Sequence, residues 1–197
     1  MNISVNDIIG IIDQVGFDAN KRKKVLRELY IDRFGEDFNV PIKWYRKRKN
    51  ADIKDALTLE GIKRGFSVRA EKTMGALPEY CGSEDQEECN RFDLSWENMG
   101  DKNYKERTSK KNFVLLVEIE MEADLVEIGR DFKKLVKNKN DCTKVMICQS
   151  KTVGEIENIK ADIEKAVTSS ASKQSVYLLS IWSWEHGGKF LHFQYKP

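Results

Sequence analysis

The segment Phe113-Val-Leu-Leu-Val-Glu-Ile-Glu-Met-Glu122 begins with five consecutive apolar residues and ends in strict alternation. Such a run is typical of a strand with both faces covered, in the middle of a sheet flanked by helices. Side chains two apart in a strand share a face, so Glu118 and Glu120 should point the same way. Burying two carboxylates is costly unless a cation meets them, and a divalent metal ion would do so. A half-exposed strand with its glutamates in water is the alternative that this segment alone leaves open.

A second alternating segment lies upstream, at residues 91–97, with the sequence Arg-Phe-Asp-Leu-Ser-Trp-Glu. Its alternation places Asp93 on the polar face. The polar residues from about 98 to 112 predict a long hairpin that joins the two segments. Folding this hairpin about its middle places Asp93 opposite Val117 and Glu118. We therefore expect Asp93 and the two glutamates of the later segment to converge on one spot.

Length and composition are those of a soluble globular protein with one domain and at most a small appendage. The chain has 197 residues, of which 40% are hydrophobic and 34% charged, and 34 basic against 32 acidic residues give a net charge of +2. This balance does not by itself indicate a nucleic-acid partner. Because no apolar run approaches membrane-spanning length and the N-terminus lacks the features of a signal peptide, we expect a cytoplasmic protein.

The cysteines do not predict a zinc site. Cys81 and Cys89 are eight residues apart, which is not a zinc-knuckle spacing, and His186 and His192 are the two histidines of the chain. We expect all four thiols to be reduced.

The N-terminal residues predict two helices. Ser4 and Asp7 form a capping box before an apolar stripe that ends near residue 15, and a second helix is expected over residues 20–34, ended by Gly35. This pair is compatible with a helix-turn-helix reader and with a helical buttress of the main core. We expect residues 1–50 to form a helical extension and residues 51–197 to form the α/β domain.

The extension ends in a basic strip at residues 43–49, Lys-Trp-Tyr-Arg-Lys-Arg-Lys. Five cations with two aromatics are typical of a surface that contacts phosphates and stacks on bases. The candidate nucleic-acid-binding residues are Lys43, Trp44, Arg46, Lys47, Arg48 and Lys49. The alternative is a solvated charge run whose aromatic side chains anchor a loop to the core.

The rest of the chain predicts alternating helices and strands. Glu60 lies on the apolar stripe of a helix expected over residues 52–64, where an acid is either a paired structural residue or part of a site. Strands are expected at 66–72, 144–149, 176–184 and 189–195, and helices after Asp124 and after Thr152. Strands joined through helices by short connections should be parallel, whereas the hairpin strands are antiparallel, so the sheet should be mixed.

This pattern resembles the PD-(D/E)XK nuclease superfamily, the restriction-endonuclease-like fold. The family core is a helix, an antiparallel strand pair that carries acidic residues, a second helix and a further strand, packed as an α/β/α sandwich. The resemblance covers residues 52–149. It aligns Asp93 with the strand-borne aspartate, Glu118-Ile-Glu120 with the (D/E)-X-K triplet and Glu60 with the acid of the first helix.

The chain departs from the family pattern at two positions. Glu120 stands where the family usually has lysine, as in the Glu-X-Glu variant of some restriction enzymes, and Phe92 replaces the usual proline. In other branches of the family the lysine comes from the following helix. At about 100° per residue, Lys133 borders the apolar stripe of that helix and Lys134 points nearly opposite it, so Lys133 is the expected substitute.

The resemblance implies metal-assisted hydrolysis of phosphodiester bonds in DNA. Asp93, Glu118 and Glu120 would hold Mg²⁺ or Mn²⁺, with Lys133 as a further catalytic residue, and Glu120 would bind the ion or act as the base. The expected partners are DNA and, in a homodimer, a second copy of the chain, with no membrane. Two alternatives stay open: a catalytically degenerate nucleic-acid-binding protein of the same fold, and a non-enzymatic α/β interaction protein.

Overall fold

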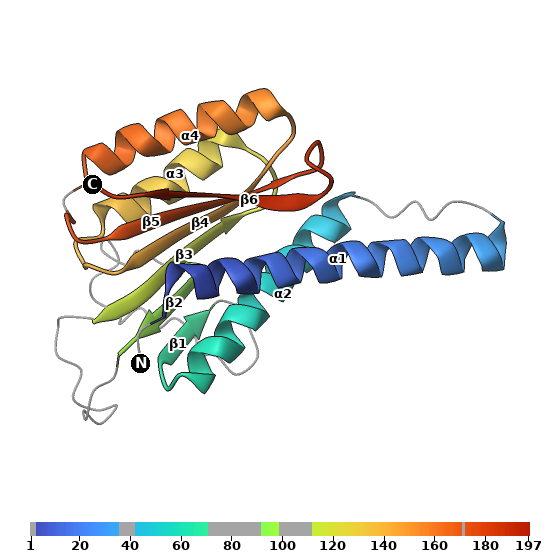
Figure 1. Ribbon diagram of the computed structural model, residues 1–197, viewed down its shortest axis with the longest axis horizontal. Coiled ribbons are helices and arrows are strands. Elements are labelled where there is room, and N and C mark those ends of the chain that lie inside the picture. The colour runs from blue at the N-terminus through green and yellow to red at the C-terminus, as the bar shows by residue number, and fades with distance from the viewer. Residues whose placement is uncertain (1–2, 36–41, 71–91, 99–111, 171) are drawn as a thin grey trace, which may run out of the picture.

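The computed structural model describes residues 3–35, 42–70, 92–98, 112–170 and 172–197 (Figure 1). In these residues four helices and six strands follow in the order α1 (Val5–Phe34), α2 (Ile42–Lys63), β1 (Ser67–Ala70), β2 (Leu94–Glu97), β3 (Phe113–Glu120), α3 (Leu125–Lys137), β4 (Thr143–Ser150), α4 (Val153–Thr168), β5 (Val176–Ser183) and β6 (Lys189–Tyr195). The strands form one sheet in chain order. The neighbours β3, β4 and β5 run parallel, and the other neighbours run antiparallel.

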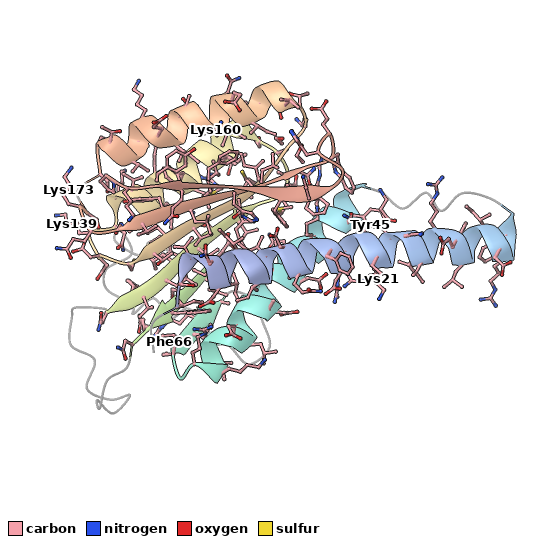
Figure 2. All side chains as sticks on the ribbon, in the orientation of Figure 1. Lys21, Tyr45, Phe66, Lys139, Lys160 and Lys173 are labelled. Carbon is pink, nitrogen blue, oxygen red and sulfur yellow. The ribbon has the colours of Figure 1, made fainter. Side chains whose placement is uncertain are left out.

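The sheet has a helical layer on each face, as Figure 1 shows. The first hydrophobic core lies between the sheet and α1 with α2, and it includes Ile8, Ile12, Ile53, Leu57, Leu115 and Val117. The second core lies between the sheet and α3 with α4, and it includes Leu116, Ile128, Phe132, Met146, Ile159 and Leu179. Figure 2 shows side chains filling both spaces. The predicted mixed sheet and α/β class are therefore confirmed.

Strand β3 occupies the interior of the sheet, between β2 and β4. Leu115 and Leu116 belong to opposite cores and are both fully buried. This double burial accounts for the run of five apolar residues, because neither face of the strand meets water. The prediction of an interior strand at this position is confirmed.

Helix α1 is one continuous helix of 30 residues, so the prediction of two separate helices is wrong. The predicted caps are present: Ser4 and Asp7 form the capping box, and Gly35 ends the helix with φ 70°. Gly16 does not break the helix. A Cβ atom there would lie 2.9 Å from the Trp182 ring, so glycine is needed for the close approach of helix and sheet. With no turn inside α1, residues 5–34 do not form a helix-turn-helix unit.

Helix α2 begins at Ile42, earlier than predicted. The basic strip at residues 43–49 is therefore the first two turns of α2, and the helix expected over residues 52–64 is its continuation. The expected division at residue 50 falls inside this helix. The strip therefore belongs to the same helix that packs on β1 and β2.

The carboxyl ends of β3, β4 and β5 lie at one edge of the sheet because these strands are parallel. Open α/β sheets bind ligands at this edge. Glu118 and Glu120 lie near the end of β3, and Trp182 lies near the end of β5. No helix among the described residues is both long and apolar enough to cross a lipid bilayer.

Candidate active site

Asp93 and Glu118 lie beside each other at the junction of β2 and β3. Leu94, the first residue of β2, pairs with Val117, which brings Asp93 to the level of Glu118. The Asp93 Oδ2 atom accepts a hydrogen bond of 2.9 Å from the backbone N–H of Ile119. This bond fixes the aspartate across the end of β3, as the folding of the hairpin predicted.

Each of the two carboxyl groups meets a lysine from a different helical layer. The Nζ atom of Lys54 on α2 lies 2.6 Å from Asp93 Oδ1. The Nζ atom of Lys134 on α3 lies 3.3 Å from Glu118 Oε1 and 2.8 Å from the Oδ1 atom of Asp131. Three acidic residues and two lysines therefore gather at the end of β3.

Glu118 is the most deeply buried acid of this group, with 2% of the residue exposed. Burial, reinforced by the negative charges of Asp93 and Asp131, raises the pKa of Glu118 to about 9 against the opposing effect of Lys134. Burial lowers the pKa of Lys134, but the hydrogen bond to Asp131 and the charge of Glu118 outweigh it, and the net pKa is raised. Burial thus favours the protonated form of Glu118, whereas the neighbouring acids favour the charged form of Lys134.

Glu120 does not join Asp93 and Glu118. Its Oε1 atom accepts a hydrogen bond of 2.5 Å from the backbone N–H of Glu122, which turns the carboxylate toward the backbone just after β3. Burial raises the pKa of Glu120, the hydrogen bond from Glu122 opposes this rise, and the charge of Asp131 adds to it. The predicted convergence therefore brings together two of the three carboxylates.

Lys134, and not Lys133, reaches the acids. Lys133 is exposed, whereas Lys134 contacts Glu118. The apolar residues of α3 alone place Leu125, which is exposed, on the expected stripe and leave out Asp131, which is buried. Replacing one by the other rotates the buried face of α3 toward Lys134. The signal was available: Asp131 stands three residues after Ile128 and four before Leu135, both of which are buried.

The first-helix acid also differs from the expectation. Glu60 of α2 forms an ion pair of 2.7 Å with Arg64, the residue directly after this helix, and Arg64 also contacts Asp7 of α1. The residue of α2 that meets Asp93 is Lys54, which sequence reasoning missed. A lysine on a helix gives no sign of its partner until the sheet register is known.

The site offers two carboxylates for a metal ion, not the three that were predicted. Within the described ranges, no group of three or more His, Cys, Asp or Glu side chains could hold a metal ion. Mg²⁺, however, is usually held by one or two carboxylates with water and substrate phosphate as the other ligands. Asp93 and Glu118 supply such a pair, and a bound cation would offset the repulsion between their negative charges.

The residues of the basic strip do not share one surface. Lys47 is exposed, Arg46 Nη1 donates a hydrogen bond of 3.4 Å to the backbone carbonyl of Glu122, and Arg48 forms an ion pair of 2.9 Å with Asp52. Lys49 is buried. Trp44 is largely exposed, and the side chain of Lys43 lies outside the described residues. The prediction that the strip binds nucleic acid remains a prediction.

A serine–histidine–aspartate arrangement occurs elsewhere but is not a nucleophilic site. Nε2 of His192 lies 2.9 Å from Oδ1 of Asp13, and Nδ1 lies 2.9 Å from Oγ of Ser180. Ser180 is fully buried in the sheet, so no substrate carbonyl can reach its hydroxyl. The arrangement ties α1 to β5 and β6.

Comparison with known protein families, curated proteins and solved structures found no match to this chain. The chemistry of the site therefore has to be inferred from its own residues.

Proposed function

We propose that this protein is a metal-dependent endonuclease that hydrolyses phosphodiester bonds of DNA. The observation that carries the proposal is the pairing of Asp93 with Glu118 at the end of an interior strand, each with a lysine at contact distance. Carboxylates can hold a metal ion, and the neighbouring lysines can stabilise the negative charge that develops on a phosphate during hydrolysis. A site that only stabilised the fold would gain more from apolar side chains at these positions.

The arrangement of elements supports the same assignment. Helix α2, the antiparallel pair β2–β3 with the acids, helix α3 and strand β4 follow in the order expected for a restriction-endonuclease-like core. The lysine that the triplet lacks at Glu120 is supplied by Lys134 of the following helix. These features favour the PD-(D/E)XK assignment made from the sequence.

Each residue of the site has a distinct part in the proposed mechanism. Asp93 and Glu118 would hold Mg²⁺, which lowers the pKa of the attacking water and neutralises charge on the phosphoryl oxygens when it is bound. Because its pKa is raised to about 9, Glu118 would have to release a proton in order to hold the cation. Lys134 then stabilises the negative charge that develops on the phosphate. Lys54 holds Asp93 in place through the 2.6 Å ion pair.

The test is cleavage of supercoiled and linear DNA with Mg²⁺ or Mn²⁺, read on a gel. We expect the wild-type protein to cut, and both Asp93→Asn and Glu118→Gln to lower the rate by roughly a hundredfold or more. Glu60→Gln is the matched control, because Glu60 is an acid of α2 that pairs with Arg64 and not with the site. A loss of activity in Glu60→Gln equal to that in Glu118→Gln would contradict the assignment of the site.

The second candidate is a DNA-binding protein of the same fold that does not cut. It is favoured by Glu120, whose carboxylate bonds to the backbone just after β3 and leaves two carboxylates for a metal ion. Salt-dependent DNA binding without cleavage under any metal would support this candidate. Absence of DNA binding, metal binding and cleavage together would overturn both.

A further inference from the structure

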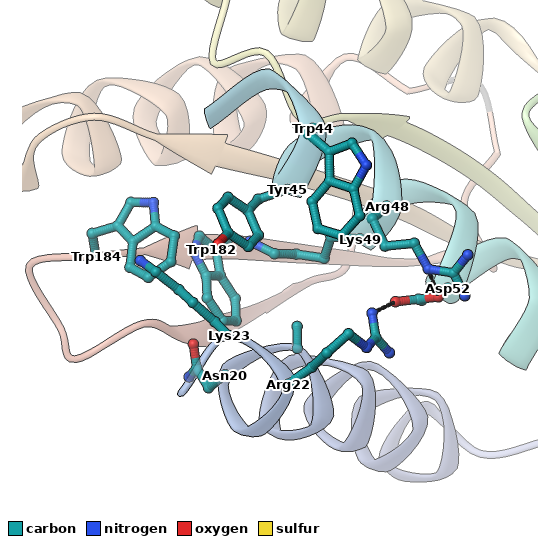
Figure 3. A pocket seen from close by; sticks show the side chains of 11 residues that line it. Asn20, Arg22, Lys23, Trp44, Tyr45, Arg48, Lys49, Asp52, Trp182 and Trp184 are labelled. Atoms are coloured by element: carbon teal, nitrogen blue, oxygen red, sulfur yellow. Dashed lines mark hydrogen bonds and ion pairs between the residues drawn. The ribbon is translucent and has the colours of Figure 1, made fainter. Parts of the chain in front are cut away.

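A pocket of about 380 Å³, counting the part open to solvent, lies between α1, α2 and the end of β5. Figure 3 shows its lining, in which the indoles of Trp44, Trp182 and Trp184 surround the side chains of Lys23 and Lys49. None of these residues belongs to the Asp93–Glu118 site. Most of this volume is open to solvent, and the enclosed part has room for one small group only, so the rest of a ligand would lie on the rim.

Lys49 is the buried lysine of this pocket. The residue is 4% exposed, and its Nζ atom lies 3.4 Å from the centroid of the Trp182 ring. No carboxylate of the described residues forms an ion pair with it. Burial and the nearby charges of Arg46 and Lys23 lower the pKa of Lys49 to about 6. A buried lysine without an anion is unfavourable, and contact with an indole compensates for part of that cost only.

The other charges of the pocket leave it positive. Asp52 is the carboxylate of the lining, and it is already engaged by Arg22 at 2.8 Å and by Arg48 at 2.9 Å. Lys23 lies 4.4 Å from the Trp184 ring centroid and 5.5 Å from that of Tyr45, over two aromatic faces. The pocket is therefore prepared for an anion, which would meet Lys49 and Lys23 together.

The exposed indoles specify what else the ligand carries. Trp44 is 45% exposed and Trp184 is 41% exposed, although both line the pocket. Large aromatic surfaces at the rim of a cationic pocket are suited to stacking on a flat ring. If residue 49 only packed against the indoles, it would not need a charge, since methionine or leucine would fill the same space without desolvating an ammonium group.

We propose that this pocket binds one nucleoside phosphate, with the phosphate on Lys49 and the base stacked on an exposed indole. The nucleotide is either free or part of a DNA strand. The second case rests on the proposed function: Lys49 and the Lys54 that contacts Asp93 lie on one helix, about 7.5 Å apart along its axis and about 140° apart around it. A strand in contact with Asp93 and Glu118 would place a neighbouring nucleotide near the pocket.

The test is binding in EDTA, where no divalent cation is present and nothing is cut. The probes are dAMP, deoxyadenosine, inorganic phosphate and a 5′-phosphorylated single-stranded oligonucleotide, followed by calorimetry and by quenching of tryptophan fluorescence. We expect dAMP to bind about tenfold or more tightly than deoxyadenosine or phosphate. Lys49→Met and Trp184→Leu should each weaken dAMP binding about tenfold or more. Lys133→Met, which removes an exposed lysine of α3, should leave it unchanged.

The pH dependence supplies a second measurement. Since the bound phosphate favours the charged form of Lys49, the affinity for dAMP should fall as pH rises from 7 to 9, above the second pKa of the phosphate near 6, by up to about tenfold per unit. The slope should disappear in Lys49→Met. In the absence of ligand this variant should be at least as stable as the wild type, because it removes a buried amine.

The outcomes separate this inference from the proposed nuclease. Pocket-dependent binding of the oligonucleotide but not of dAMP would assign the site to a strand, and would support the inference. Equal affinity for phosphate and dAMP, or unchanged binding in Lys49→Met, would overturn it even if the protein cuts DNA. Binding of dAMP by a protein that cuts nothing would overturn the nuclease proposal alone.

Discussion

Lys134 on α3 places its ammonium nitrogen 3.3 Å from the Oε1 atom of Glu118 on β3. The contact crosses from the helical layer to an almost fully buried strand residue, and Asp131 holds the same ammonium at 2.8 Å. Glu118 and Asp131, from two consecutive elements, thus share the ammonium group of Lys134. A lysine fixed in this way is positioned before a substrate arrives, which is the condition for electrostatic stabilisation of a transition state.

The first prediction compares two adjacent lysines of α3. Lys134→Met should lower the rate of DNA cleavage by roughly a hundredfold, because it removes the charge beside Glu118. Lys133→Met should cut at the wild-type rate, since Lys133 is exposed. Single-turnover cleavage at saturating protein checks this, with circular dichroism to confirm folding. Equal losses in the two variants would assign the effect to DNA binding by the helix surface and not to the site.

The second prediction concerns stability and pH. The pKa of Glu118 is raised from 4.5 to about 9, so between these values the folded protein binds a proton that the unfolded chain has released. The contribution of Glu118 to stability is therefore fully present below about pH 4.5 and is lost as pH rises through 9, by up to about 1.4 kcal/mol per unit. Lys49, whose pKa is lowered, acts in the opposite direction above pH 6.

The measurement that isolates Glu118 is the difference between wild type and Glu118→Gln in urea unfolding with EDTA. The variant should gain stability relative to the wild type as pH rises from 5 to 9. Mg²⁺ should raise the melting temperature of the wild type at pH 8 and leave that of the variant unchanged. A difference that does not change with pH would mean that Glu118 is ionised throughout the range.

The third prediction concerns the basic strip. Since Lys47 is exposed, whereas Arg48 pairs with Asp52, Lys47→Ala should flatten the logarithmic salt dependence of DNA binding by about 0.9. The triple variant with Arg46→Ala and Arg48→Ala should flatten it further, by roughly one unit for each phosphate that the protein no longer neutralises. Lys173→Ala is the control, because this lysine is exposed before β5, away from Tyr45 in Figure 2. An unchanged slope in the triple variant would assign the strip to solvent and internal ion pairs.

The sequence predicted those parts of the fold that depend on local pattern. The apolar run of β3 indicated that both faces of the strand are buried, and the capping residues Ser4, Asp124 and Thr152 located three helix starts. Counting residues on both sides of the predicted hairpin placed Asp93 opposite Glu118. Each of these signals lies within a few residues of the feature that it predicts, or depends on a register that can be counted.

Features that depend on distant partners were not predictable in the same way. Helices α1 and α2 are longer than the segments from which they were predicted, and no proline interrupts either of them. Gly16 does not end a helix but allows α1 to approach Trp182 closely. Lys49 reads as one more charge of a basic run, and its burial depends on an indole at the far end of the chain. The buried face of α3 includes an acid, Asp131, so counting apolar residues alone gave the wrong orientation for this helix.

The last prediction uses two glycines of α1 to test how closely this helix approaches the sheet. A Cβ atom at Gly16 would lie 2.9 Å from a ring atom of Trp182 and 3.1 Å from one of Phe190, whereas nothing lies within 4 Å of a Cβ atom at Gly10. Gly10→Ala should therefore stabilise the protein by up to about 1 kcal/mol through helix propensity. Gly16→Ala offers the same propensity gain, but it overpacks two buried rings, which costs about 1–3 kcal/mol.

For Gly16→Ala we expect a net loss of stability in urea unfolding, together with a change in tryptophan fluorescence, because Trp182 also lines the pocket that holds Lys49. If both variants were stabilised equally, α1 would be free to move away from β5 and β6, and the pocket between them could not be a rigid site.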